Sequence, residues 1–265
     1  MYLTTDDMLA EKEESRRHRC RISLEELQSM VKYVEHTLEY TKESHPEWSY
    51  ETDTPTYKYI KRLDGNAGVL RSRTLLRVPG VPPQALFDCL FNPESRLAFD
   101  KFYTRFEVSR VVEDDLDVLV SEVEAPLGVS NREFVEWRRM YLPNLSHARQ
   151  YMRYVIYLRS CDDSECSPEV QPKQKKVERA EAWMSGYIMK WWFQDGQLMG
   201  SELLVISQVD NKGMLPKFLV NTVTASGPKK WASSLRDAVC KICLNKIDIN
   251  SMSDEELEAH FNIRR

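Results

Sequence analysis

The fold is decided by residues 201–242, which read SELLVISQVDNKGMLPKFLVNTVTASGPKKWASSLRDAVCKI. The first ten residues are rich in apolar and β-branched side chains and end at the turn-forming sequence Asp210-Asn211-Lys212-Gly213, as expected for a strand. Apolar residues then recur every three or four positions, which is typical of a helix packed on one side. Gly227-Pro228 interrupts this pattern, and because proline lacks a backbone N–H, we expect a kink there. The segment predicts a strand followed by a long, bent helix whose faces carry Leu219, Val220 and Val223, then Trp231, Leu235, Ala238, Val239 and Ile242.

The chain upstream predicts further strands. A period-two pattern runs through residues 48–78, and Pro79-Gly80-Val81-Pro82-Pro83 then ends it, because proline fits a first helical turn but not a strand ladder. Short turns such as Asp195-Gly196 imply antiparallel neighbours. We predict a curved antiparallel sheet with the long helix against its concave side. The expected helices are 83–91 and 93–102, the expected strands are 105–112, 118–125, 132–142, 151–159, 178–190 and 201–210, and residues 161–176 are expected to form a long loop.

Three regions are expected along the chain: an N-terminal amphipathic helical segment (1–45), the main domain (46–248) and a short acidic C-terminal tail (249–265). In the first region, Ser23 and Glu26 have the spacing of a capping box. This helix either packs on the domain, which we favour, or binds a partner. Its expected apolar face consists of Leu24, Leu27, Val31, Val34 and Leu38.

Composition excludes several classes of protein. The 265 residues are 42% hydrophobic and 29% charged, as in folded domains, and a formal net charge of −4 gives no global positive field for nucleic acid. No apolar run resembles a signal peptide or reaches the roughly 18 residues of a spanning helix. The six cysteines are therefore expected to be reduced thiols in a cytoplasmic protein.

Motifs for catalysis are missing from the sequence. It contains no glycine-rich phosphate loop, GxSxG elbow or HExxH motif, and Cys240 and Cys243 form an isolated CxxC without a second ligand pair. Paired acids such as Asp114-Asp115 fall in expected turns, where aspartate caps backbone amides. We therefore expect no enzyme activity, no metal and no cofactor.

Four motifs, taken in order, resemble the START domain, the steroidogenic acute regulatory protein-related lipid transfer domain. They are Arg96-Leu97-Ala98-Phe99-Asp100, Ser130-Asn131-Arg132-Glu133-Phe134-Val135, Gly200-Ser201, and Asp210 to Lys217 followed by Asn221. The likeness covers roughly residues 48–247. It implies a helix-grip fold, an α+β architecture in which the sheet grips the C-terminal helix around a tunnel for one lipid. The implied function is lipid binding and intermembrane transfer, most simply of glycerophospholipids.

Within this family the chain looks closest to the phosphatidylcholine transfer branch, which implies roles for individual residues. Arg96 and Asp100 would lie near the lipid phosphate, where a guanidinium forms two parallel charge-assisted bonds. The open alternative is a helix-surface ion pair. Phe134 and Trp183 would match two rings of a choline cage, or be plain core, while Ser121 stands where a third ring is expected, which admits a smaller head group. The implied lipid-binding residues are Arg96, Asp100, Ser121, Phe134, Trp183, Leu219, Val223 and Trp231.

Entry of a lipid would need a gate with transient membrane contact. The candidate residues lie on two loops, Leu127 and Val129 on one, and Met214 and Leu215 on the other. Trp191-Trp192-Phe193 is a second candidate. Two alternatives to phospholipid transfer remain: a sterol carrier, in which Glu122 or Glu124 would serve as the cavity acid, and a lipid-sensing regulatory module that docks an unknown protein through its N-terminal helix or through Asp254-Glu255-Glu256.

Overall fold

The computed structural model describes residues 21–36, 41, 43–64, 69–125, 128–143, 149–161, 177–212, 217–243, 253 and 256, with only the backbone course described for 63–64 and 217–226. Its helices are α2 (Leu24–His36), α3 (Pro83–Phe91), α4 (Pro93–Phe99), η3 (Arg149–Tyr151) and α5 (Lys217–Ile242). Its strands are β1 (Ser49–Thr54), β2 (Tyr57–Asp64), β3 (Val69–Pro79), β4 (Tyr103–Glu113), β5 (Leu116–Val123), β6 (Asn131–Tyr141), β7 (Arg153–Ser160), β8 (Val177–Arg179), β9 (Glu181–Gln194) and β10 (Gln197–Asp210).

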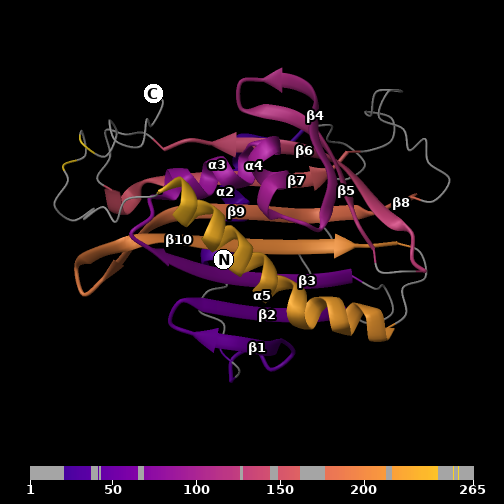
Figure 1. The fold of residues 1–265 in the computed structure, drawn as a ribbon, viewed down its shortest axis with the longest axis horizontal. Coiled ribbons are helices and arrows are strands. Elements are labelled where there is room, and N and C mark those ends of the chain that lie inside the picture. Colours follow the sequence, from indigo (N-terminus) through magenta and orange to yellow (C-terminus); the bar gives the residue numbers. More distant parts are fainter. Residues whose placement is uncertain are drawn as a thin grey trace.

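All the strands belong to one sheet, in the order β1-β2-β3-β10-β9-β7-β6-β5-β4, with β8 beside β6. Neighbours along this path are antiparallel, and β8 pairs with β6 in parallel. The sheet curves strongly at β4 and β5, and α3, α4 and α5 lie against one face while α2 lies on the other (Figure 1). This arrangement confirms the predicted helix-grip architecture.

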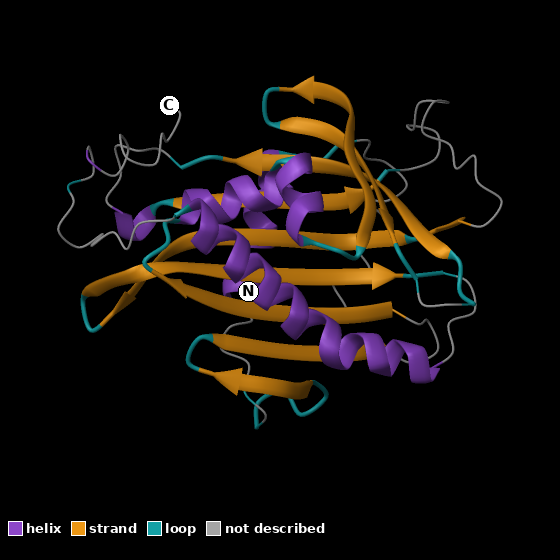
Figure 2. Ribbon diagram, in the orientation of Figure 1, coloured by secondary structure: helices purple, strands orange, loops and turns teal. Residues whose placement is uncertain are grey.

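The N-terminal helix packs on the convex face of the sheet. Leu27, Met30, Val31 and Val34 of α2 are buried in one cluster with side chains of the central strands. Glu26 accepts hydrogen bonds from Arg159 (2.8 Å) and Tyr157 (3.2 Å). The helix is thus a layer of the fold behind the sheet (Figure 2).

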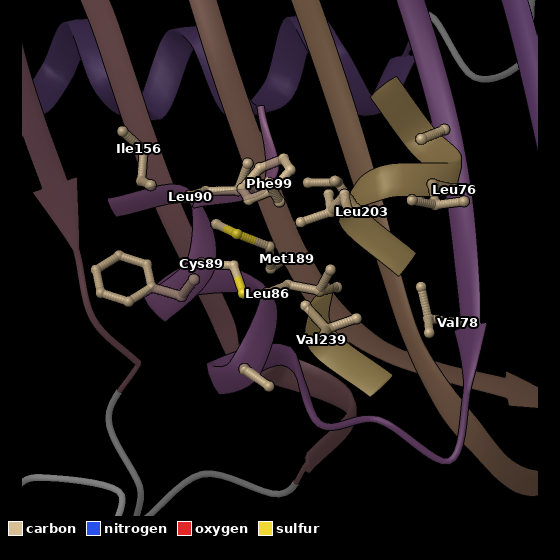
Figure 3. Packing of buried hydrophobic residues seen from close by; sticks show 14 of the residues in the cluster. Leu76, Val78, Leu86, Cys89, Leu90, Phe99, Ile156, Met189, Leu203 and Val239 are labelled. Carbon is tan, nitrogen blue, oxygen red and sulfur yellow. The ribbon is translucent and has the colours of Figure 1, made fainter. Parts of the chain in front are cut away.

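The concave face packs against the other helices at one end of the sheet. Leu86 and Leu90 of α3 and Leu235 and Val239 of α5 are fully buried there together with Leu203 of β10 (Figure 3). α5 begins near the end of the sheet where β10 finishes and runs diagonally to α3 (Figure 1). Its second half is therefore fixed in the core.

Several details differ from the sequence predictions. The expected helix 93–102 ends at Phe99, because Asp100 has an extended backbone. Ala180 separates β8 from β9, where one strand was expected, and Leu24 and Ile242 are more than half exposed, although each was assigned to an apolar helix face. Ser23 caps α2 by accepting from the Glu26 backbone N–H (3.1 Å), but the Glu26 side chain bonds to β7 instead of completing the box. Leu38 and most of the loop 161–176 lie outside the described residues.

Candidate functional site

The buried centre of the concave side is an ion pair between Arg96 and Asp100. Asn92 begins α4 by accepting the Ser95 N–H (3.0 Å), and four residues separate the pair along this short helix. Arg96 Nη2 lies 3.0 Å from Asp100 Oδ2, and both side chains are almost fully buried. The ion pair of the open alternative is therefore present, but it is buried and does not lie on the helix surface. Trp231 of α5 donates its indole N–H to the same Asp100 oxygen at 2.9 Å, so the sequence-predicted residues of α4 and α5 do meet.

Aromatic rings surround the Arg96 guanidinium. Its central carbon lies 5.0 to 5.8 Å from the ring centres of Phe99, Tyr103, Phe106, Tyr187 and Trp231. Burial by itself lowers the pKa of Arg96, but the interactions with Tyr187, Tyr103 and Asp100 outweigh this effect and raise the pKa above its usual value. Arg96 is thus a permanent buried cation in an aromatic environment, which strengthens its electrostatic interactions.

A second acid, Glu136 of β6, lies in the same region. Its side chain is buried, and this burial raises its pKa to about 7, although Arg138 and Arg96 act in the opposite direction. Sequence reasoning missed Glu136, Tyr103 and Tyr187. The alternation of β6 around Phe134 would have placed Glu136 on the same face, which is the signal that could have found it.

Strand register relates the other predicted residues to the rings around Arg96. Ser121 of β5 lies opposite both Phe106 of β4 and Phe134 of β6, which forms a row across three strands. Ser121 is buried and offers no ring, whereas Phe134 is half-buried. Trp183 lies on β9, four residues from Tyr187, or roughly 13 Å along the strand. Phe134 and Trp183 are not among the described rings around the Arg96 guanidinium, and their role in a choline cage stays a prediction.

The concave face is less closely packed than the convex face at the end where α5 begins. Along β9, outward-facing residues such as Met184 and Ile188 are buried, whereas Trp183, Ser185 and Tyr187 on the concave side are only partly buried. The same holds for β10 and for the first part of β3. The partly buried concave residues, termed here the inner surface, are Leu70, Ser72, Phe134, Trp183, Ser185, Tyr187, Val205 and Ser207. Ser72, Ser207 and Ser185 are register partners and bring three hydroxyl groups into one row.

The comparisons with known proteins fit this geometry. The profile of the START domain matches residues 28–244. The chain belongs to the START domain family. No curated protein sequence matches it. Among solved structures, human STARD10 is similar with a TM-score of 0.65 and 19% identity over 90% of this chain and 88% of that one.

Two further START structures have similar scores. The human StAR-related lipid transfer protein 5 gives a TM-score of 0.61 with 15% identity over 82% of this chain and 98% of that one. A STAR-related lipid transfer protein from Xanthomonas axonopodis gives 0.53 with 15% identity over 73% and 98%. At these sequence identities the likeness shows the fold of the chain and nothing finer.

The START-like motif at residues 130–135 connects the two predicted gate loops. Arg132 donates from Nε to the Asn211 carbonyl (2.7 Å) and from Nη2 to the Lys212 carbonyl (3.2 Å), and it also bonds to the Ser130 carbonyl. The turn before β6 is thereby tied to the segment that leads into α5. Val129 is half-buried beside this connection, whereas Leu127, Met214 and Leu215 lie outside the described residues. Leu219 and Val223 lie on α5 where only the backbone is described.

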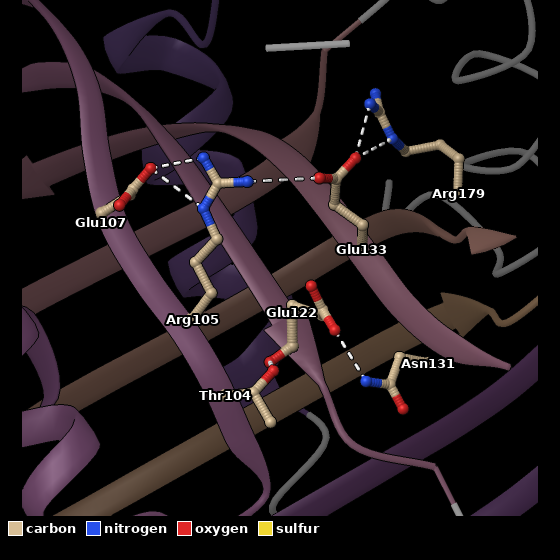
Figure 4. Close-up of polar contacts among 7 residues, drawn as sticks. All are labelled: Thr104, Arg105, Glu107, Glu122, Asn131, Glu133 and Arg179. Atoms are coloured by element: carbon tan, nitrogen blue, oxygen red, sulfur yellow. Dashed lines mark hydrogen bonds and ion pairs between the residues drawn. The ribbon is translucent and has the colours of Figure 1, made fainter. Parts of the chain in front are cut away.

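Glu122 of β5 and Glu133 of β6 face outward. Glu122 accepts a hydrogen bond from Asn131 (2.7 Å), and Glu133 accepts two from Arg179 (2.8 and 3.2 Å), as Figure 4 shows. Glu122 follows Ser121 on its strand, so it lies on the convex side and Ser121 on the concave side. The sterol alternative therefore gains no cavity acid from Glu122, and Glu124 is exposed beyond the end of β5.

Proposed function

We propose that the protein binds one lipid between the inner surface and α5 and carries it between membranes. Membership of the START family and the structural likeness to lipid transfer proteins support this function. The observation that carries it is the difference in burial between the two faces of the central strands. Apolar and aromatic side chains that point toward α5, among them Phe134 and Trp183, are incompletely covered by the chain itself.

The energetics of lipid transfer assign different roles to the inner surface and to the buried polar group around Arg96. Each chain methylene gains about 0.8 kcal/mol on leaving water, but it gains nearly the same in a bilayer as in a protein. The apolar contribution therefore largely cancels when a lipid moves from membrane to protein. A few polar contacts decide which lipid is bound, and the buried group of Arg96, Asp100 and Trp231 supplies such contacts.

A glycerophospholipid fits this arrangement. Its acyl chains would lie along the inner surface, and its phosphate would approach Arg96, which is a stronger anion partner in a low-dielectric site than at the surface. Lipid transfer requires only that the protein binds and releases the lipid, so we assign no catalytic group. The protein would work in the cytoplasm and contact membranes transiently. None of the described helices is long and apolar enough to span a membrane.

A matched pair of tryptophan variants tests this function. Ser207→Trp places a bulky ring on the inner surface, whereas Ser109→Trp adds the same ring to an exposed position of β4. Transfer of a fluorescent phospholipid from donor to acceptor vesicles is measured, together with the lipid load by native mass spectrometry. We expect Ser207→Trp to lose at least about tenfold in transfer and to carry less lipid, because it fills the space for an acyl chain.

The control variant Ser109→Trp is expected to transfer lipid at the wild-type rate. Failure of the wild-type protein to take up any lipid, or an unchanged lipid load in a folded Ser207→Trp variant, would overturn the proposal. Binding of one lipid without movement between vesicles would instead favour a lipid sensor over a carrier.

A further inference from the structure

Glu136 differs from the other buried acids of the protein. The buried acidic side chains among the described residues are Asp100, Asp117, Glu133, Glu136 and Glu202. Four of them have an ion-pair partner: Arg96 with Asp100, Arg138 with Asp117, Arg179 with Glu133, and Arg77 with Glu202. For Glu136, no hydrogen bond or ion pair within the described ranges is found. Because an unpaired buried carboxylate is costly, this position needs an explanation.

Strand alternation places the Glu136 carboxylate on the lipid side of the sheet. Val135 and Trp137, its neighbours on β6, pack in the cluster under α2. Arg138, two residues on, reaches the Phe91 carbonyl at the end of α3 on the concave side (2.8 Å). Glu136 shares this face and lies opposite Leu119 of β5, beside the row of Ser121 and Phe134.

Charged groups around Glu136 are already neutralised by other partners. Arg138 forms two hydrogen bonds to Asp117 (2.6 and 3.0 Å), and Arg96 pairs with Asp100. The phenol groups of Tyr103 and Tyr187 lie in the same region, and Glu136 and Arg96 influence the pKa of Tyr103. Glu136 therefore leaves one negative charge in excess on this part of the concave face when it is ionised.

Arg96 offers the complementary feature. Its Nε is buried and finds no hydrogen-bond acceptor in the described part of the chain. Within the described residues, a donor without an acceptor and an acid without a donor thus lie on the same face of the sheet. A ligand that both accepts and donates hydrogen bonds would satisfy the two groups together.

We propose that Glu136 selects a zwitterionic lipid head group whose ammonium group donates N–H hydrogen bonds to its carboxylate, as that of phosphoethanolamine does, with the phosphate toward Arg96. This inference rests on the proposed lipid-carrier function and specifies its ligand. A choline group satisfies the charge but has no N–H, and Ser121 supplies no ring to compensate by cation–π attraction. An anionic head group would add a further negative charge beside Glu136.

Competitive loading tests the proposal. The protein is incubated with vesicles containing equal amounts of phosphatidylethanolamine, phosphatidylcholine and phosphatidylglycerol with identical oleoyl chains, and the bound lipids are quantified by mass spectrometry. We expect the wild-type protein to take up phosphatidylethanolamine at least about tenfold above the other two. Glu136→Gln should reduce this preference to within about twofold, because it removes the charge-assisted hydrogen bond.

Glu122→Gln is the matched control, since Glu122 lies on the outward side of the neighbouring strand, and it should keep the wild-type preference. Equal uptake of the three lipids by the wild type, or an unchanged preference in Glu136→Gln, would overturn the inference and leave lipid carriage standing. Absence of uptake from all vesicles would overturn the proposed function and this inference with it.

Discussion

Trp231 of α5 donates its indole N–H to Asp100 of α4, and this carboxylate is the one that neutralises Arg96. The contact joins the C-terminal helix directly to the buried polar centre. It lies three residues after Pro228, at the point where α5 passes from the inner surface to the filled core. The position of the helix and the electrostatics of the centre are therefore physically linked.

Trp231→Phe keeps an aromatic ring but removes this hydrogen bond. Because a bond to a buried carboxylate contributes more than a neutral one, we expect the free energy of unfolding to fall by about 2 kcal/mol. Trp191→Phe is the control, since the buried Trp191 N–H has no acceptor among the described residues. Urea unfolding measures both variants, and equal losses would contradict the assigned role of the hydrogen bond.

Replacing Arg96 alone should lower the free energy of unfolding more than replacing both members of the ion pair. Arg96→Met leaves Asp100 buried without its cation, which costs about 3 to 5 kcal/mol. Combining it with Asp100→Asn, which retains an oxygen for Trp231, should recover about half of that loss. A double-mutant cycle of unfolding free energies checks this result. A double variant less stable than Arg96→Met would show that the ion pair is not the main contribution.

Glu136 should make stability depend on pH. Its pKa is about 7 in the folded protein because of burial, against 4.5 as the reference value, so between these pH values the folded state retains a proton that the unfolded state has lost. The free energy of unfolding should therefore fall by roughly 3 kcal/mol from pH 4.5 to 7 through this group. The difference between wild type and Glu136→Gln, measured by urea unfolding at several pH values, isolates the effect. A constant difference across the range would contradict it.

Gly200 should tolerate no side chain. Its φ is +152°, and a Cβ there would lie 2.8 Å from the Gly80 nitrogen and even closer to the Val78 carbonyl. Both obstacles are backbone atoms, so Gly200→Ala should cost roughly 3 kcal/mol. Gly196→Ala also has a positive φ but open space around the new methyl group, and it should cost roughly 1 kcal/mol. Thermal unfolding measures the stability loss of both variants. A larger loss in Gly200→Ala than in Gly196→Ala shows the steric clash, because both variants share the cost of a side chain at positive φ, and equal losses would contradict it.

Local sequence signals predicted most of the elements, because they depend on neighbouring residues. Prolines 82, 83 and 93 located the starts of α3 and α4, and the apolar spacing predicted α5. The end of α4 was missed because Asp100 takes an extended backbone, and its contact with Trp231 of α5 is a tertiary one that the local sequence does not show.

The polar centre was only partly predictable for a similar reason. Arg96, Asp100 and Trp231 were found through resemblance, whereas Glu136 was missed: strand alternation puts it on the same face of β6 as Phe134, but the sequence does not show that its carboxylate is buried. The same applies to Arg132, two of whose acceptors are backbone carbonyls about 80 positions away in the chain. No sequence motif records such a partner.

The fixation of the second half of α5 has a mechanical consequence. Leu235 and Val239 hold this half in the core, and Pro228 just before it removes one backbone hydrogen bond of the helix. For a protein that carries a lipid as proposed, substitutions at Gly227-Pro228 should change the rates of lipid entry and release, whereas the buried polar groups set which lipid is bound. Rate and selectivity would then depend on different residues.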